Sequence, residues 1–310
     1  MTRFDERPGT LRIWFVALRP FSFSVSLLPV VMGTVLAGYA GYGFFWGRFC
    51  MLLLAVVLVH AAANLLNDAF DYIRGVDRNV YPVSGAVVRG WLTAGAVKRV
   101  AYWLLGIGGG LAVLLFWLTG WGMFGLMLAG LALALGYTRS GICLKYLGLG
   151  DPAILLGFGV LPVLAGWWTQ AETISRLPFL WSVPSGLLAV AIVHANNWRD
   201  RRHDAEKGCR TLAVRIGAVG CRLYWQALLL VPMLLVPGAV LWARATSIDG
   251  YAPVWTLIIF LVFPEVVQLV RVDWSRDTSA MAALDARAAR FHSAFTFLLL
   301  LGFLLAWWLQ

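Results

Sequence analysis

The chain has 310 residues, of which 61% are hydrophobic and 13% are charged, and its mean hydropathy is +0.78. An ordinary soluble domain carries about 25% charged residues, so this chain has too little polar surface to cover a water-soluble globule. The formal net charge is +10. Such a charge is compatible with a nucleic-acid-binding protein or with a membrane protein, and the distribution of the basic residues separates the two.

Long apolar runs are the main pattern along the chain. A helix rises about 1.5 Å per residue, so about 20 apolar residues cross the hydrocarbon layer of a membrane. Lipid offers no partner to free backbone groups, and the alternating pattern of a barrel is absent, so each run is predicted to be a helix. About nine runs are predicted, and they are Phe21–Tyr39, Phe49–Leu66, Val100–Leu118, Trp121–Tyr137, Pro152–Trp168, Phe179–Asn197, Leu223–Trp242, Pro253–Val270 and Phe291–Leu309.

These runs predict an all-α, polytopic membrane protein, with residues 1–310 forming a single integral membrane domain. About 20 charged or mixed residues precede the first run, which shows no small-residue cleavage site of the A-x-A kind. We therefore expect the first run to be retained as a span.

The basic residues are distributed unevenly between the two sets of loops. With nine spans, the N-terminus and the even-numbered loops share one side, and all but three of the 25 Lys and Arg fall there. The exceptions are Arg48, Arg176 and Arg244. Cytoplasmic loops carry an excess of Lys and Arg, so the N-terminus is predicted to be cytoplasmic and the C-terminus to lie outside. The charge is thus a topology signal, and no nucleic-acid partner is expected.

An Asn/Asp-rich stretch, residues 64–78, follows the second apolar run. If the helix continues through it, Asn64, Asp68 and Asp71 share one face, because their spacing is i, i+4 and i+7. This stretch is the first motif of the chain.

A similar stretch, residues 196–208, follows the sixth run and is the second motif. Asn196, Asp200 and Asp204 share one helical face at spacing i, i+4 and i+8, with Asn197 one position round. Both helices run in the same direction, so both motifs meet the same membrane boundary. We therefore expect two pseudo-repeated halves, each with one motif.

Carboxylates that face one another across a cavity repel unless cations lie between them. Mg²⁺ prefers carboxylate oxygens and usually takes phosphate oxygens as further ligands. The two motifs therefore predict a magnesium site and, through it, a phosphorylated substrate. Basic side chains in three neighbouring loops are suited to bind a diphosphate, and they are Arg74, Arg78, Lys145, Arg199, Arg201, Arg202 and Lys207.

Some of these features also have a second interpretation. For each basic residue, the alternative to diphosphate binding is a role in setting the positive-inside topology of the membrane protein. A transporter or ion channel is the alternative class of protein, since intramembrane acids and repeated halves occur there too, but acids at one membrane face rather than at the midplane favour an enzyme. His60 and His194, each one turn or less before an Asn of a motif, are interpreted as buried hydrogen-bonding groups rather than as metal ligands.

At these residues the sequence resembles the UbiA superfamily of intramembrane prenyltransferases. Within it, the likeness is to the 1,4-dihydroxy-2-naphthoate polyprenyltransferases of menaquinone synthesis. The resemblance extends over nearly the whole chain, in the family's order. The matching stretches are residues 17–20, 64–77, 137–138, 145–151 and 196–215.

The resemblance implies nine transmembrane helices around a central cavity in a bacterial-type inner or cell membrane, with the site opening to the cytoplasm. It implies Mg²⁺ as the cofactor. The implied metal ligands are Asp68, Asp71, Asp200 and Asp204, with Asn64 and Asn197 completing the set. The residues implied to bind the diphosphate are Arg74, Arg78, Lys145, Arg199 and Lys207.

The implied reaction transfers a polyprenyl chain from a prenyl diphosphate to an aromatic acceptor, here a dihydroxynaphthoate. Cations beside the leaving diphosphate stabilise the charge that grows on it, which is a catalytic role for Lys145. Asp71 or Asp77 would be the base, and Arg19 and Tyr137 would contact the acceptor, Arg19 through a carboxylate. Further acceptors of the superfamily remain alternatives, namely homogentisate, 4-hydroxybenzoate, a chlorophyllide or a phosphosugar.

Overall fold

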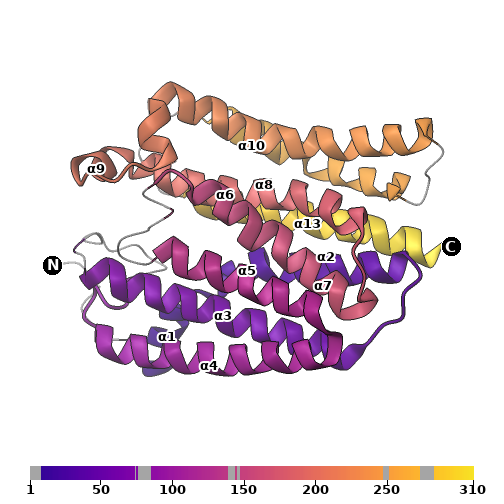
Figure 1. The fold of residues 1–310 in the computed structure, drawn as a ribbon. Coiled ribbons are helices and arrows are strands. Elements are labelled where there is room, and N and C mark those ends of the chain that lie inside the picture. The colour runs from indigo at the N-terminus through magenta and orange to yellow at the C-terminus, as the bar shows by residue number, and fades with distance from the viewer. Residues whose placement is uncertain are drawn as a thin grey trace.

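The computed structural model describes residues 8–73, 75, 85–138, 144, 147–246, 251–272 and 283–310. Every regular element in these ranges is a helix (Figure 1). The α-helices and the shorter helices η1 (3-10), η2 (π) and η4 (3-10) are, in chain order, α1 Thr10–Leu18, η1 Pro20–Ser22, α2 Ser24–Tyr39, α3 Trp46–Ile73, α4 Ala94–Thr119, α5 Trp121–Thr138, α6 Gly150–Ile154, η2 Leu155–Val160, α7 Leu161–Ala171, α8 Arg176–Arg199, α9 Arg201–Glu206, α10 Leu212–Ala245, η4 Val254–Val262, α11 Phe263–Val270 and α13 Leu284–Trp308.

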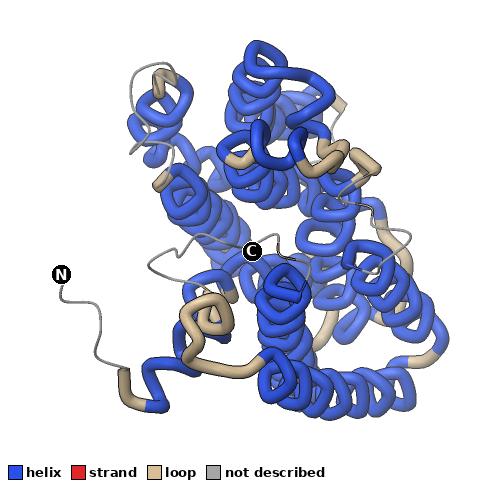
Figure 2. The backbone as a smooth tube through the Cα atoms, turned by 90° about the vertical axis from the view of Figure 1, so that its left-hand side faces the viewer, coloured by secondary structure: helices blue, strands red, loops and turns tan. Residues whose placement is uncertain are grey.

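The long helices lie side by side with their axes in roughly one direction. Helix α9 lies at one end of this bundle and the C-terminus at the other (Figure 1). Both α3 and α8 run toward the end where α9 lies, and α9 continues from α8 there. Figure 2 views the molecule from this end, with most helices seen end-on. The topology therefore brings the two Asn/Asp-rich motifs to the same end of the bundle, which we call the motif end.

The prediction of an all-α, polytopic membrane protein is confirmed for the described residues, but the count of about nine spans is not. Six helices are long and apolar enough to cross a membrane, and α1–η1 with α2 form a seventh if this bent pair is one span. The remaining two predicted runs are not among these seven candidates; they correspond to shorter apolar stretches of helix, Trp121–Ala134 within α5 and Val254–Val270. Because η4 takes up the first nine residues of the latter, only eight residues form the α-helix α11.

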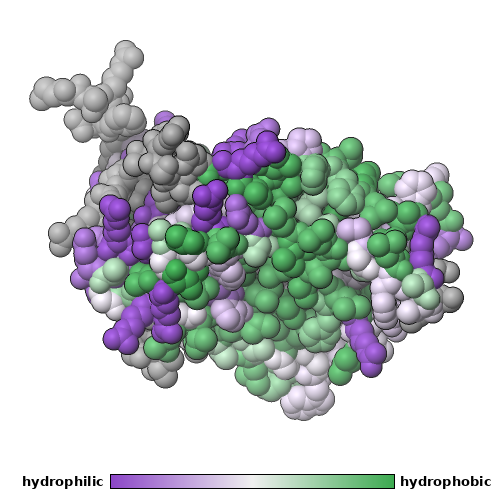
Figure 3. Space-filling view, turned by 90° about the horizontal axis from the view of Figure 1, so that it is seen from above, coloured by the Kyte–Doolittle hydropathy of each residue, from purple (hydrophilic) through white to green (hydrophobic). Residues whose placement is uncertain are grey.

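The surface has the character expected of a protein solvated by lipid. Seen from above, an apolar band crosses the middle of the molecule, and hydrophilic residues gather toward the motif end (Figure 3). The opposite side is also apolar, since α4, at the bottom of Figure 1, has Trp103 and Trp117 75% and 77% exposed. A soluble protein seldom exposes large contiguous apolar areas, so this band is the surface that contacts the hydrocarbon layer.

Close contacts between small residues hold the middle of the bundle together. A Cβ atom at Gly33 of α2 would overlap the backbone of Val163 in α7, and one at Gly166 of α7 would overlap the backbone of Val30 in α2. Lipid tails are as apolar as leucine side chains, so helices in a membrane associate through close van der Waals packing at such small residues. The two glycines therefore set the distance between α2 and α7.

We predict that Gly33→Ala destabilises the protein by about 1–3 kcal/mol, because the added methyl group meets backbone that cannot move aside. The matched control is Gly109→Ala in α4, where a Cβ would meet no atom within 4 Å. Thermal unfolding in detergent measures the difference. A midpoint for Gly33→Ala equal to that of Gly109→Ala would contradict the predicted contact.

Candidate functional site

The first motif lies at the end of α3. The helix extends to Ile73, so Asn64, Asp68 and Asp71 do lie on successive turns of one helix. The Asp68 side chain is only 1% exposed and Asn64 is also buried, whereas Asp71 is half-buried. A carboxylate removed from water in this way must be compensated by hydrogen bonds or by a cation.

The two oxygen atoms of Asp68 have different surroundings. Oδ2 accepts a hydrogen bond from the backbone nitrogen of Val87 at 3.1 Å. Oδ1 lies 3.7 Å from Nη2 of Arg19, and it is buried without a hydrogen bond from any described residue. An orphaned buried carboxylate oxygen needs an explanation in a folded protein, and a bound cation is one that fits this atom.

A sharp corner between α1 and α2 packs against the first motif. The segment Thr10–Ser22, which comprises α1 and η1, meets α2 at an angle of 46°, and Arg19, between α1 and η1, has left-handed backbone angles, φ 53° and ψ 55°. Such a conformation costs a non-glycine residue about 1–3 kcal/mol, so the surroundings must hold it. Ser22 donates to the Arg19 carbonyl at 2.8 Å, and Asn64 donates to the Leu18 carbonyl at 2.9 Å. The corner and the first motif therefore position one another.

The second motif begins at the end of α8 and continues into α9. The continuous helix assumed from the spacing is interrupted, since α8 ends at Arg199 and α9 begins at Arg201. The backbone nitrogen of Asp200 still donates to Asn196, and that of Asp204 donates to Asp200, at 3.0 and 2.9 Å. These bonds preserve the i, i+4 relation across the junction.

Within this second motif, Asn197 and Asp204 are buried, whereas the Asp200 side chain is 39% exposed. Arg199 binds the Asp200 carboxylate through two parallel hydrogen bonds of 3.0 and 3.1 Å, and its Nη1 lies 3.6 Å from Asp285 of α13. Arg199, which was expected to bind a diphosphate, is thus held by two carboxylates.

The two motifs meet at their far ends. Nζ of Lys207, just beyond α9, donates to the carbonyl of Gly75, just beyond α3, at 2.9 Å. This contact joins segments that are 132 residues apart in the sequence. Four predicted site residues lie outside the described part of the chain, and they are Arg74, Asp77, Arg78 and Lys145.

The described residues contain no group of three His, Cys, Asp or Glu side chains placed to hold a metal by themselves. Mg²⁺ usually binds through one or two carboxylates together with the phosphates of a substrate, rather than in an all-protein cage. The side-chain atoms of both motifs that can coordinate a metal are oxygens, and Oδ1 of Asp68 lacks a hydrogen bond. The residues present therefore fit Mg²⁺ bound together with a phosphorylated ligand.

Both predicted buried histidines form hydrogen bonds within the protein. His60 contacts the hydroxyls of Ser22 and Ser26, and Nε2 of His194 lies 3.1 Å from the Cys221 carbonyl. Their interpretation as hydrogen-bonding groups is confirmed. Tyr137, near the end of α5, is half-buried and packs against the largest core cluster.

Sequence reasoning missed Ser22, Ser26 and Asp285. The two serines are spaced i, i+4 at the start of an otherwise apolar run, a signal that could have been used. Asp285 carried no comparable signal, because its contact with Arg199 joins segments distant in the sequence. Asp151 is buried and hydrogen-bonded to Tyr224, although only the resemblance pointed to its stretch of the chain.

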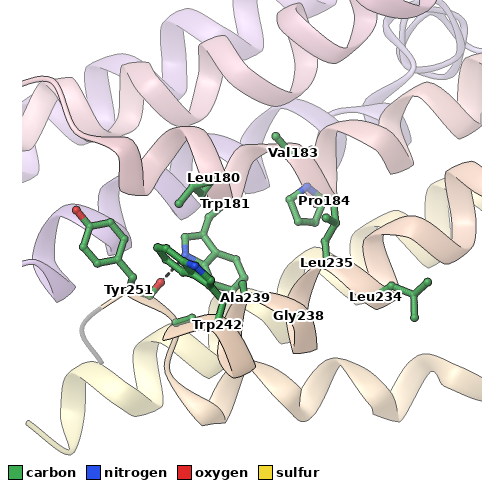
Figure 4. A pocket seen from close by; sticks show the side chains of 11 residues that line it. Leu180, Trp181, Val183, Pro184, Leu234, Leu235, Gly238, Ala239, Trp242 and Tyr251 are labelled. Carbon is green, nitrogen blue, oxygen red and sulfur yellow. Dashed lines mark hydrogen bonds between the residues drawn. The ribbon is translucent and has the colours of Figure 1, made fainter. Parts of the chain in front are cut away.

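A cavity of about 440 Å³ lies between α8 and α10 (Figure 4). Its lining is mostly apolar, and Trp181 donates from its ring nitrogen to the Tyr251 carbonyl at 2.8 Å. Trp181 precedes Asp200 by 19 residues, which is roughly 28 Å along a helix. The cavity is therefore separate from the site formed by the two motifs.

Comparison with known proteins places these features in a family. Residues 26–295 match the model of the UbiA prenyltransferase family. The chain is 30% identical over 322 residues to the 1,4-dihydroxy-2-naphthoate octaprenyltransferase of Escherichia coli, covering 98% of this chain and 99% of that one. It is 36% identical over 226 residues to the mouse UbiA prenyltransferase domain-containing protein 1, covering 72% of this chain and 66% of the relative. This chain thus spans about two thirds of the length of such animal relatives.

Solved structures share the fold. A UbiA homologue from Archaeoglobus fulgidus, bound to GPP and Mg²⁺, superposes with a TM-score of 0.62 at 16% identity, covering 93% of this chain and 99% of that one. An apo UbiA homologue from Aeropyrum pernix superposes with a TM-score of 0.64 at 16% identity, covering 93% of this chain and 98% of that one. At this identity the likeness supports the fold, while the match over residues 26–295 and the full-length relative establish that the chain is a member of the UbiA family of prenyltransferase enzymes.

Proposed function

We propose that this protein transfers a polyprenyl chain from a Mg²⁺-complexed prenyl diphosphate to 1,4-dihydroxy-2-naphthoate, a step of menaquinone synthesis. The assignment of a prenyl diphosphate as substrate is supported by the pair of Asn/Asp motifs at one end of an apolar bundle. One oxygen of the buried Asp68 carboxylate has no hydrogen-bond partner among the described residues. The acceptor is supported by the 30% identity to the Escherichia coli enzyme over nearly the whole length of both chains.

In this proposal the residues of the two motifs hold the metal through oxygen atoms, and they are Asn64, Asp68, Asp71, Asn197, Asp200 and Asp204. Bound Mg²⁺ would neutralise the charge that grows on the departing diphosphate. The basic residues that add to this effect are Arg74, Arg78, Lys145, Arg199 and Lys207.

The acceptor ring attacks the carbon atom whose bond to the diphosphate breaks. Carbon dioxide and a proton then leave the hydroxynaphthoate, and Asp71 or Asp77 would accept the proton. The apolar interior of the bundle keeps water from the allylic cation that forms when the carbon–oxygen bond breaks. Tyr137 contacts the acceptor ring.

The proposal predicts that the purified protein, given Mg²⁺, a prenyl diphosphate and 1,4-dihydroxy-2-naphthoate, releases inorganic diphosphate and carbon dioxide and forms a prenylated dihydroxynaphthalene without the carboxyl group. Asp68→Asn and Asp200→Asn should each lower turnover by at least about a hundredfold, because each removes a charged ligand while keeping the side chain's shape. Product mass and diphosphate release are the measurements.

Each outcome of this assay separates the alternatives. Prenylation of 4-hydroxybenzoate or homogentisate instead of the naphthoate would reject the acceptor and keep the prenyltransferase. An absence of diphosphate release with every acceptor would reject the enzyme in favour of a transporter. Near-normal turnover in both variants at limiting Mg²⁺ would reject these metal ligands.

Arg19 is proposed to bind the carboxylate of the acceptor. Its side chain is only 25% exposed, and its Nε atom is buried without a hydrogen-bond partner among the described residues. A buried guanidinium with a free donor is well suited to an anion, and hydrogen bonds to charged groups are stronger than neutral ones.

Arg19→Gln should therefore raise the apparent KM for the naphthoate by at least about tenfold, since a hydrogen bond to a charged group contributes about 1.5–3 kcal/mol. The apparent KM for the prenyl diphosphate should change by less than about twofold, because only one substrate loses a contact. Steady-state kinetics with each substrate varied in turn provide the measurement. An equal rise in both constants would instead assign Arg19 to the metal site, through its contact with Asp68.

The motif end is proposed to face the cytoplasm. Of the three basic residues on the other side, Arg48 is paired with Glu172 at 2.6 Å and donates to the Leu118 carbonyl at 2.9 Å. Arg48 is therefore satisfied within the protein and does not weaken the charge asymmetry that sets the orientation.

Cysteine labelling in cells tests this orientation. In a variant without native cysteines, Ile174→Cys should react with an impermeant maleimide in intact cells, because Ile174 is 87% exposed between α7 and α8 at the opposite end. Arg202→Cys on α9 should react only after permeabilisation. The reverse pattern would place the site outside and contradict the proposal.

A further inference from the structure

His60 lies in α3, one turn before Asn64, and is 8% exposed. Its Nδ1 atom is 2.6 Å from Oγ of Ser26, and its Nε2 atom is 3.1 Å from Oγ of Ser22. Phe23 and Phe158 flank the ring, with centroids 5.3 and 5.4 Å away. These contacts fix the position of the imidazole ring, and the mechanism proposed above assigns no role to His60.

The direction of each hydrogen bond follows from elementary chemistry. A backbone carbonyl can only accept, so Ser22 must donate its single hydroxyl hydrogen to the Arg19 carbonyl. Toward His60, the Ser22 oxygen can then only accept, which places a hydrogen on Nε2. The ring is buried and has no carboxylate partner among the described residues, which favours the neutral form. In that form Nδ1 accepts from Ser26.

The same argument orients the side-chain amide of Asn64. Its Nδ2 atom is 2.9 Å from the Leu18 carbonyl and 3.2 Å from Oγ of Ser22, and both of these atoms are acceptors here. Both amide hydrogens are therefore used. The reversed amide would place its oxygen against the Leu18 carbonyl, which is repulsive. The carbonyl oxygen Oδ1 of Asn64 is thus the atom left for a ligand.

We infer that His60 is a positioning residue for the metal site. It holds Ser22 in the orientation that accepts from Asn64, and Asn64 is thereby fixed with its oxygen available to Mg²⁺, which binds oxygen and not an amide N–H. Partners behind metal ligands fix their orientation, and their loss typically weakens metal binding by about 10–100-fold. This inference rests on the proposed function, because it takes Asn64 as a metal ligand.

The test measures metal binding rather than turnover. Purified protein is saturated with geranyl thiolodiphosphate, an unreactive diphosphate, and bound Mn²⁺ is measured by electron paramagnetic resonance. His60→Leu should weaken Mn²⁺ binding about tenfold. His60→Gln should restore most of the affinity, because its amide nitrogen can donate to Ser22. Ser22→Ala, which removes the acceptor for Asn64, should weaken binding as His60→Leu does.

His292→Leu is the matched control. His292 is also fully buried in a membrane helix, and neither of its ring nitrogens has a hydrogen-bond partner among the described residues. Its replacement should leave the Mn²⁺ affinity unchanged. If His292→Leu weakens binding as much as His60→Leu, the effect is general loosening of the bundle, and the inference is overturned.

A double-mutant cycle decides whether His60 acts through Asn64. In an Asn64→Ala background, His60→Leu should cause no further loss of affinity, since the ligand that it positions is gone. An equal loss in both backgrounds overturns the inference. Failure of the unsubstituted protein to bind Mn²⁺ with the diphosphate overturns the proposed function itself, whereas normal binding by His60→Leu overturns only the positioning role.

Discussion

The constraint on which the rest of the site depends is the burial of a carboxylate at a membrane boundary. Asp68 is 1% exposed, so its charge must be compensated by protein groups or by a cation. One oxygen accepts from Val87, and the other faces Arg19 at a distance too long for a hydrogen bond. Arg19 can face it only because the chain takes a left-handed turn there. The strained corner, its serine bonds and the first motif therefore form one unit.

The two motifs have different structural surroundings although their composition is similar. The first lies within a continuous helix and is buried against the α1–α2 corner. The second spans a break between two helices, and its exposed Asp200 is held by Arg199 rather than by backbone. A rigid, buried half and a more exposed half suit a ligand that enters from the motif end and is enclosed by both. The Lys207–Gly75 contact joins the two halves at that end.

Several polar groups beside the first motif form hydrogen bonds with one another. In the hydrogen-bonded chain of Ser26, His60, Ser22 and Asn64, every polar side-chain hydrogen is donated, and Oδ1 of Asn64 is left for a ligand. In a medium that offers no water, such a closed arrangement allows little freedom of orientation. The same absence of water lets small residues, such as the glycine pair between α2 and α7, determine how closely helices approach.

The amino-acid sequence by itself determined the helical class, the shared direction of α3 and α8, and the two motifs, because hydropathy and helical spacing are local properties. The superfamily could also be identified from the sequence, since its motifs are short and contiguous. Only the tertiary structure decided that Arg19 faces Asp68, that Asp285 reaches Arg199, and that the eighth apolar run divides into the 3-10 helix η4 and the eight-residue helix α11. Those facts depend on a left-handed turn, on contacts between distant segments and on how a helix ends, and none of these follows from the periodicity of a single segment.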